Sequence, residues 1–161
     1  MWAWCYGFAV GTEGVVVGRV IEVRPHPDGE HIWLADVNVG TDWPLQIIWG
    51  GMPIVKKGSL VPVAKPGAWL PATKDKPNRY KLRTRRYRGV RSEGMLCSLA
   101  ELGWDPSATD RVALLEGSDL SPGYSLDDIG PDWKLIVKPA VDLFGTRDSA
   151  AFQSPKVLQT T

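Results

Sequence analysis

Short apolar runs separated by turn residues dominate the first 90 positions of the chain. Runs with strand-like alternation cover residues 15–23, 31–39, 44–49, 59–64 and 80–88. A Gly or Pro lies within two residues after each of the first four runs, and no helical periodicity interrupts them. Five short strands in about 75 residues predict an all-β fold with a small closed barrel rather than an α/β sheet.

The run at 80–88 differs from the other four because neither of its faces is apolar. In an extended strand, one side would carry Lys81, Arg83, Arg85 and Tyr87, and the other would carry Leu82, Thr84, Arg86 and Arg88. Such a strand cannot be buried on both sides. We therefore expect this segment at a rim or edge of the barrel, with at least one side in water.

Downstream of the strands the pattern contains short helical signals. Ser98 and Glu101 fit a capping box, which predicts a short helix over residues 99–102 that ends at Gly103. A second helical turn is expected from residue 125 to Gly130, and residues 133–144 fit an additional strand. The predicted organisation is therefore an N-terminal extension (1–13), a barrel domain with an appended C-terminal β portion (14–144) and a flexible tail (145–161).

Charge is distributed unevenly along the 161 residues, although the formal net charge is only +1. Residues 56–91 hold twelve Lys or Arg and a single acid, Asp75, whereas residues 92–132 hold nine acids and one Arg. Such separation creates a local positive field that concentrates anions on one face. The alternative interpretation of the basic segment is a solvated, charge-rich loop. The hydrophobic content of 43% is sufficient for the core of one domain.

Cysteine content and hydropathy limit the class of protein. The sequence contains only Cys5 and Cys97, with no Cys-x-x-Cys pair, which argues against a disulfide scaffold or zinc ribbon and favours a reducing compartment. No apolar run reaches the length of a membrane span, and the apolar N-terminus lacks the basic start of a signal peptide. We therefore expect a cytoplasmic protein with no membrane partner.

The segment HPDGEH, residues 26–31, places two His and two acids within six positions. A metal site there would need further ligands for closed coordination, and Pro27 and Gly29 favour a turn instead. A catalytic alternative pairs Cys97 as nucleophile with His26 or His31 as base. The apolar neighbours of Cys97 favour a buried, unreactive side chain. No cofactor, metal or chemical step is therefore expected.

Three groups of aromatic residues bear on the core and on possible contacts. Trp33 and Trp49, within predicted strands, are expected in the core or an interface rather than as stacking platforms. Trp2, Trp4 and Phe8 either cover a barrel end or form a dimer contact, and the sequence leaves both possibilities open. The basic segment interleaves its charges with Trp69, Tyr80 and Tyr87, the pattern expected where a nucleobase stacks.

Four stretches, VVVGRVIEVRPHPDGEHIWLADVNVG, LQIIWGG, GSLVPVAKPGAWLP and above all RGVRSEGMLCSLAELGW, resemble the tRNA-binding domain of the oligonucleotide-binding (OB) fold. That domain occurs at the start of the bacterial phenylalanyl-tRNA synthetase β subunit and in stand-alone tRNA-binding proteins. The resemblance covers about residues 14–144. It implies a five-stranded Greek-key barrel that binds tRNA without catalysis, as an accessory to an aminoacyl-tRNA synthetase or another tRNA-using enzyme. Homodimerisation is left open.

The resemblance also implies that Ser92 and Met95 are surface contacts near the tRNA, with Arg88 beside them. Cationic side chains suit phosphate contacts, and Arg can clamp a phosphate with two hydrogen bonds. The predicted tRNA-binding residues are therefore Lys56, Lys65, Lys81, Arg83, Arg85, Arg86, Arg88, Arg91, Ser92 and Met95. The alternative function is a protein-interaction barrel that has lost RNA binding.

Overall fold

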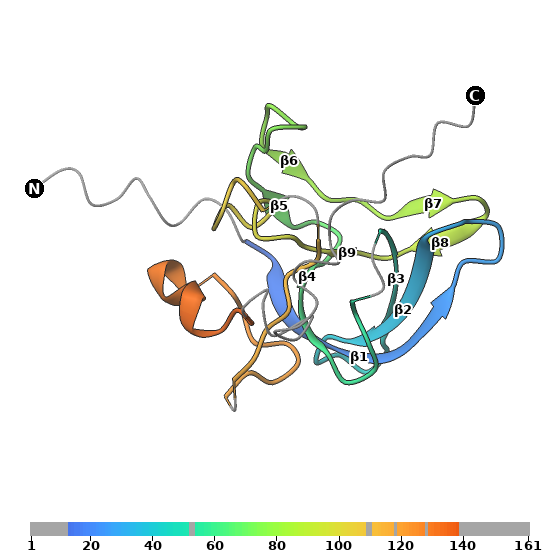
Figure 1. Cartoon of the computed structure of the whole chain (residues 1–161), viewed down its shortest axis with the longest axis horizontal. Coiled ribbons are helices and arrows are strands. Elements are labelled where there is room, and N and C mark those ends of the chain that lie inside the picture. Colours follow the sequence, from blue (N-terminus) through green and yellow to red (C-terminus); the bar gives the residue numbers. More distant parts are fainter. Residues whose placement is uncertain (1–12, 52–53, 109–110, 118, 128, 139–161) are drawn as a thin grey trace, which may run out of the picture.

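The computed structural model describes residues 13–51, 54–108, 111–117, 119–127 and 129–138 (Figure 1). Almost all regular structure in these residues is β-strand. The elements are β1 (Val15–Pro25), β2 (Ile32–Asn38), β3 (Leu45–Gly50), β4 (Leu60–Ala64), β5 (Trp69–Leu70), β6 (Tyr80–Lys81), β7 (Arg85–Tyr87), β8 (Val90–Ser92), β9 (Met95–Leu96) and the 3-10 helix η1 (Gly130–Leu135). No helix in the described part of the chain is long and apolar enough to cross a membrane.

The central sheet is antiparallel and has five strands in the order β3-β2-β1-β4-β9. Its central strand, β1, is long enough to serve two partners, since Val15–Arg19 pair with β4 and Arg19–Pro25 pair with β2. The register with β2 shifts between Val20 and Glu22, which leaves Ile21 as an extra residue. A bulge of this kind bends a strand sharply, as closure of a small barrel requires.

The barrel closes where β3 meets the chain between β8 and β9. The Glu93 N–H donates to the Gln46 carbonyl at 2.8 Å, and the Ile48 N–H donates to Ser92 Oγ at 3.0 Å. These bonds occupy the edge of β3 that β2 does not use, and they leave it unavailable to another chain. The predicted all-β fold with a five-stranded OB-like barrel is therefore confirmed.

Two apolar clusters hold the barrel together. The inner cluster fills the barrel and includes Val16, Val37, Ile47, Val61 and Val63. The outer cluster lies between the barrel and the segment that follows β9, and it includes Val15, Val17, Leu70, Cys97 and Leu126. Because successive side chains of a strand point to opposite faces, β1 supplies both clusters. The Trp49 side chain lies in the inner cluster with Trp33 beside it, so the predicted core role of these tryptophans is confirmed.

The prediction of one strand over residues 80–88 is wrong. The segment forms two short strands with different partners, since β6 pairs with β5 and β7 pairs with β8. Between them, Leu82 is buried, and its backbone bonds to Ala68 and Gly67 at 2.8 Å each. The burial of Leu82 directs the chain toward β5. The segment after Leu82 then forms a separate strand, β7, which is one arm of a hairpin. The expected exposure of the charged side chains is confirmed.

The predicted helix over 99–102 is a single hydrogen-bonded turn. Its capping box is present, since the Ser98 N–H donates to Glu101 Oε2 at 2.8 Å and the Glu101 N–H donates to Ser98 Oγ at 3.2 Å. One helical bond follows, from the Leu102 N–H to the Ser98 carbonyl, and Gly103 then adopts a φ of 72°. A glycine in the left-handed conformation ends a helix. The predicted helix start at Ser98 is therefore confirmed, but the helix ends after one turn.

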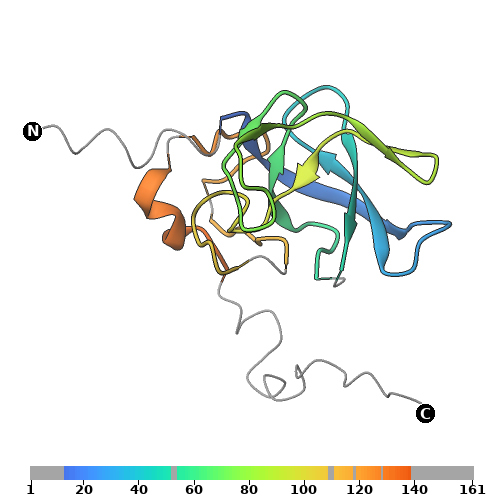
Figure 2. The same cartoon turned by 90° about the horizontal axis from the view of Figure 1, so that it is seen from above.

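The C-terminal predictions also need correction. The residues expected to end a helical turn instead begin η1, whose first positions tolerate a proline because its missing N–H has no partner there. Residues 133–135 belong to η1 rather than to a strand. Of the residues described after 135, Val137 forms an isolated β-bridge with Leu115. Residues 139–144, residues 1–12 of the predicted extension (1–13) and the predicted tail (145–161) lie outside the described residues. Figures 1 and 2 both place η1 and the β7–β8 hairpin at opposite ends of the molecule.

Candidate nucleic-acid interface

The β7–β8 hairpin carries the densest group of cationic side chains. Its strands pair Arg85 with Ser92, Arg86 with Arg91 and Tyr87 with Val90, which leaves a two-residue loop. The loop residues Arg88 and Gly89 both have positive φ, 45° and 81°. Positive φ at both positions is what a type I′ turn requires, and this turn matches the twist of a two-stranded ribbon. The loop therefore forms a tight hairpin despite an arginine in a left-handed conformation.

The outer face of the hairpin carries two arginines. Arg86 and Arg91 lie directly opposite each other and so share a face. Arg86 donates to the Gly89 carbonyl at 3.2 Å, and Arg91 Nε lies 3.7 Å from Glu93 Oε1. Like charges in opposite positions destabilise a hairpin, whereas an anion between them would relieve the repulsion. This face is suited to a phosphate.

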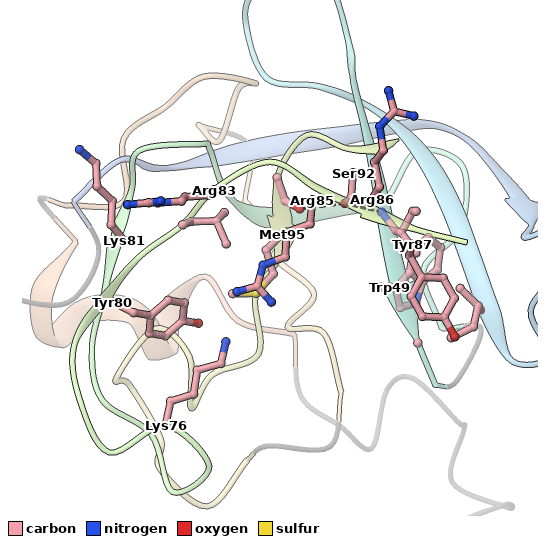
Figure 3. Close-up of a pocket in the computed structure, with 15 residues that line it drawn as sticks. Trp49, Lys76, Tyr80, Lys81, Arg83, Arg85, Arg86, Tyr87, Ser92 and Met95 are labelled. Atoms are coloured by element: carbon pink, nitrogen blue, oxygen red, sulfur yellow. Dashed lines mark hydrogen bonds between the residues drawn. The ribbon is translucent and has the colours of Figure 1, made fainter. Parts of the chain in front are cut away.

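The other face of the hairpin borders a groove of about 440 Å³ that also contacts β3, β6 and β9. Figure 3 shows Arg85 extending into the groove beside Met95, whereas Arg86 extends away from it. Apolar side chains form the floor, and cationic side chains line the rim. The floor includes Ile32, Ile48, Trp49, Leu82 and Met95, and the rim includes Lys76, Lys81, Arg83 and Arg85; Arg86 borders the groove, but its guanidinium extends away from it. None of the lining residues is an acid, so the groove has a positive rim without a countercharge of its own.

Aromatic rings beside the groove are in contact with cations. Lys76 Nζ lies 3.9 Å from the centre of the Tyr80 ring. The Arg79 guanidinium lies 4.9 Å from the centre of the Trp69 ring, and Lys81 Nζ lies 6.0 Å from it. These cation–π contacts orient the long side chains without neutralising them.

His26 ties the hairpin to the barrel. Its imidazole is buried, and its Nδ1 accepts the Asp28 N–H at 3.0 Å. The proton must therefore be on Nε2, which donates to the Tyr87 carbonyl at 3.2 Å. With both nitrogens engaged, His26 is available neither as a metal ligand nor as a base. Among the described residues no three His, Cys, Asp or Glu side chains are arranged to hold a metal ion.

Arg88 provides a second tie at the same place. Its guanidinium donates to the Asp28 carbonyl and lies 5.5 Å from the centre of the Tyr87 ring. The side chain is thus partly committed to holding the hairpin, although it remains exposed. The predicted HPDGEH turn is confirmed, because the His26 N–H donates to the Ile32 carbonyl at 2.9 Å and closes the β1–β2 connection.

Ser92 has a structural role that sequence reasoning did not find. Its hydroxyl accepts the Ile48 N–H at 3.0 Å and donates to the Gly94 carbonyl at 3.1 Å. Both capacities of the hydroxyl are therefore used in closing the barrel. Met95 is half-buried and lines the groove.

Three cationic side chains outside the hairpin and the groove show why they do not add to this surface. Lys56 precedes β4 and Lys65 follows it, so they lie at opposite ends of that strand, and neither lines the groove. Arg24 donates to Asp36 Oδ2 at 2.7 Å, and this bond raises the pKa of the guanidinium further. Positive charge that is free of ion pairs is thus concentrated on the groove rim and the hairpin. Lys76 was missed by the sequence analysis, because its position beside the groove depends on where β6 packs.

Cys97 is fully buried in the outer cluster. Burial raises the pKa of its thiol far above the ordinary range, and nearby Glu101 raises it further. A buried, protonated thiol cannot attack a substrate. The predicted buried role of Cys97 is therefore confirmed.

Comparison with known proteins agrees with this geometry. A family model described as "Putative tRNA binding domain" matches residues 15–123. The phenylalanine–tRNA ligase β subunit of Burkholderia pseudomallei (strain 1710b) is 38% identical over 147 residues, which cover 87% of this chain and 18% of that subunit. The β subunit of Thermosynechococcus vestitus is 42% identical over 124 residues, which cover 73% of this chain and 14% of that subunit.

The chain thus spans less than a fifth of the length of these two relatives. Among solved structures, the C-terminal domain of Plasmodium vivax p43 aligns with a TM-score of 0.47 and 23% identity, covering 68% of this chain and 56% of that one. The assignment does not depend on that alignment. The family match covers more than half of the chain, and the chain belongs to the tRNA-binding domain family that includes this region of the phenylalanyl-tRNA synthetase β subunit.

Proposed function

We propose that this chain binds structured tRNA through a basic surface formed by Lys81, Arg83, Arg85, Arg86, Arg88 and Arg91. The bound tRNA is retained for, or delivered to, an aminoacyl-tRNA synthetase or another tRNA-using enzyme. The chain itself performs no chemical step. Sequence similarity to the phenylalanine–tRNA ligase β subunits described above supports this accessory role.

The charge of this surface is the observation that carries the proposal. Of its six cations, only Arg91 lies within 4.0 Å of a carboxylate in the described part of the chain. Unpaired cations on a folded surface repel each other, and a polyanion relieves that repulsion while releasing its own counterions. Lys56 and Lys65 lie outside the groove lining and serve as outlying phosphate contacts.

The shape of the surface favours a folded RNA. Arg86 and Arg91 project from a narrow hairpin, which can follow the phosphates of a backbone without reading bases. The helix η1 lies at the opposite end of the molecule (Figures 1 and 2) and carries one acid, Asp132, and one cation, Lys134. A polyanion is therefore attracted mainly to the hairpin end, and this polarity orients the tRNA. Met95 extends the contact into the groove, and Ser92 holds the hairpin against β3.

A tRNA titration at two salt concentrations tests the proposal. The wild-type chain should bind with an affinity that falls steeply as salt rises, because each phosphate contact contributes about one unit of slope in logarithmic terms. The double variant Arg85→Glu with Arg86→Glu should lose binding while keeping its fold. Size measurement of the free chain and of the complex gives the stoichiometry and shows whether the chain dimerises.

A matched charge reversal provides the control. Arg19 and Lys138 are exposed, and neither lines the groove. Arg19→Glu with Lys138→Glu changes the net charge by the same amount and should leave most of the affinity. Equal loss in both double variants would mean that net charge, and not this surface, governs binding. A wild-type chain with neither affinity nor salt slope would favour the protein-interaction barrel.

A further inference from the structure

Two residues that line the groove each hold a buried polar atom without a hydrogen-bond partner. The atoms are the Trp49 indole Nε1 and the Tyr80 hydroxyl, and no other buried side-chain nitrogen or oxygen among the described residues lacks a partner. A buried donor without a partner costs free energy comparable to a lost hydrogen bond. Such a cost is retained at a binding site when a ligand supplies the partner. The Trp49 side chain is only 7% exposed, so its orientation is fixed by the core.

The charged side chains of the groove are all donors, and the hydroxyls of Tyr80 and Tyr87 can both donate and accept. The indole N–H can only donate, and the groove rim consists of Lys and Arg side chains. The Ser92 hydroxyl donates its one proton to the Gly94 carbonyl and already accepts the Ile48 N–H, and no carboxylate lines the groove. A ligand that presents carbonyl or phosphate oxygens therefore fits, whereas one that presents amino groups meets few acceptors.

The arrangement in Figure 3 has an aromatic residue at each end, with Trp49 and Tyr87 on one side, Tyr80 on the other, and Arg85 and Met95 between them. An apolar floor suits the flat face of a base, and Arg85 suits a phosphate. The volume of about 440 Å³ lies in the range of ordinary small-ligand sites. Double-stranded RNA would leave this floor uncovered, because its bases are stacked inward.

We propose that the groove binds an unpaired segment of RNA whose base carries a carbonyl oxygen at position 4, as uracil does, with Trp49 Nε1 and the Tyr80 hydroxyl donating to base oxygens. A phosphate of the same segment lies on Arg85. The inference rests on the proposed tRNA binding and adds what the groove contributes to it. Backbone phosphates of paired regions lie on Arg86 and Arg91, and one unstacked nucleotide enters the groove.

Entry requires movement of flexible side chains. Both donor atoms are shielded from bulk water, and Lys76 Nζ lies 3.9 Å from the Tyr80 ring centre. Lys76 is exposed and unbranched, so it can swing aside and then contact the incoming phosphate. Burial raises the pKa of Tyr80 to about 12, so its hydroxyl keeps its proton at neutral pH and remains a donor.

Uridine and cytidine oligonucleotides of equal length test the inference. Position 4 is a carbonyl oxygen in uracil and an amino group in cytosine, and ring N3 is a donor in uracil and an acceptor in cytosine, so a site that donates to the oxygen at position 4 favours uridine. The wild-type chain should bind the uridine oligonucleotide about three- to tenfold more tightly at one salt concentration, the worth of one or two net hydrogen bonds. Tyr80→Phe removes only the unpartnered hydroxyl and should reduce this preference without unfolding the chain. Tyr124→Phe is the matched control, since Tyr124 is exposed outside the groove, and it should keep the preference.

Three results would overturn the inference. Equal affinity for the two oligonucleotides, in a chain that still binds tRNA with a salt slope, would remove the base contact and leave the proposed function standing. A uridine preference that survives in both Tyr80→Phe and Trp49→Phe would remove the assigned donors. Absence of binding to tRNA and to both oligonucleotides would remove the proposed function and the inference together.

Discussion

The His26 imidazole lies edge-on to the Tyr87 ring, with ring centroids 5.5 Å apart and an interplanar angle of 82°. Its Nε2 donates to the Tyr87 carbonyl at 3.2 Å. A side chain from the β1–β2 turn thus holds the last residue of β7. Because Arg88 also donates to the carbonyl of Asp28 in that turn, the tip of the arginine hairpin is tied to the barrel twice. The position of the proposed RNA-binding surface depends on these two ties.

Replacing His26 by Phe tests the first tie. Phe keeps an aromatic ring against Tyr87 but removes two hydrogen bonds, which leaves the Asp28 N–H and the Tyr87 carbonyl without these partners. The expected loss in the free energy of unfolding is about 1–3 kcal/mol. Chemical denaturation measures it, and hydrogen exchange should show the largest increase at the Val90 amide of the hairpin.

His31→Asn is the matched control for that substitution. His31 is exposed in the same turn and has a φ of 55°, a conformation that Asn tolerates. Its effect should stay within about 0.5 kcal/mol. An equal loss in the free energy of unfolding for the two variants would show that the turn as a whole, rather than the two hydrogen bonds of the His26 imidazole, holds the hairpin to the barrel.

A pair of glycine substitutions separates stability from RNA binding. Gly89 and Gly58 have φ values of 81° and 87°, and a Cβ would meet nothing within 4 Å at either position. Alanine should therefore cost backbone strain alone, about 1–2 kcal/mol in each case. Only Gly89→Ala should weaken tRNA binding, because Gly89 shapes the turn that presents Arg86 and Arg91. An equal loss of affinity in Gly58→Ala would place the interface near Lys56 instead.

The facing pair Arg86 and Arg91 should show a trade-off between stability and binding. Arg86→Thr removes a like-charge repulsion together with an exposed hydrogen bond to the Gly89 carbonyl, and should raise the free energy of unfolding by up to about 1 kcal/mol. The same change should lower the salt slope for tRNA by about one. Arg19→Thr on β1, where the facing residues are Asn38 and Leu60, should give neither effect. A stabilisation of similar size at both positions would point to strand propensity rather than to charge relief.

The first four strands could be predicted from local pattern, because each alternates in polarity and meets a Gly or Pro soon after it ends. The division of residues 80–88 into two strands could not be predicted in this way, because it depends on backbone hydrogen bonds between Leu82 and the distant residues Gly67 and Ala68. The two-residue strand β5 is too short to leave a periodic signal. A local sequence pattern predicts a strand correctly only where the neighbouring strands pair with it along its whole length.

The candidate site was predictable in part for the same reason. Composition alone marks the region of Arg85, Arg86 and Arg91, since charge density is visible without a fold. Their division between two faces requires the hairpin register, and the groove requires Trp49 from another strand. Ser92 was expected at the RNA surface, but the Ile48 N–H that occupies its hydroxyl is contributed by a residue far away in sequence.

Tyr80 should make stability sensitive to alkaline pH. Burial raises its pKa from an ordinary value near 10 to about 12, with a smaller contribution from Glu101. The fold thus favours the protonated phenol, and this contribution to stability is fully present below pH 10 and is lost as the pH rises toward 12. Tyr80→Phe has no proton to lose, so its denaturation midpoint should fall less than that of the wild-type chain across this interval. Tyr124→Phe, which keeps Tyr80, should follow the wild type, and parallel curves for all three chains would contradict the buried position of the Tyr80 hydroxyl.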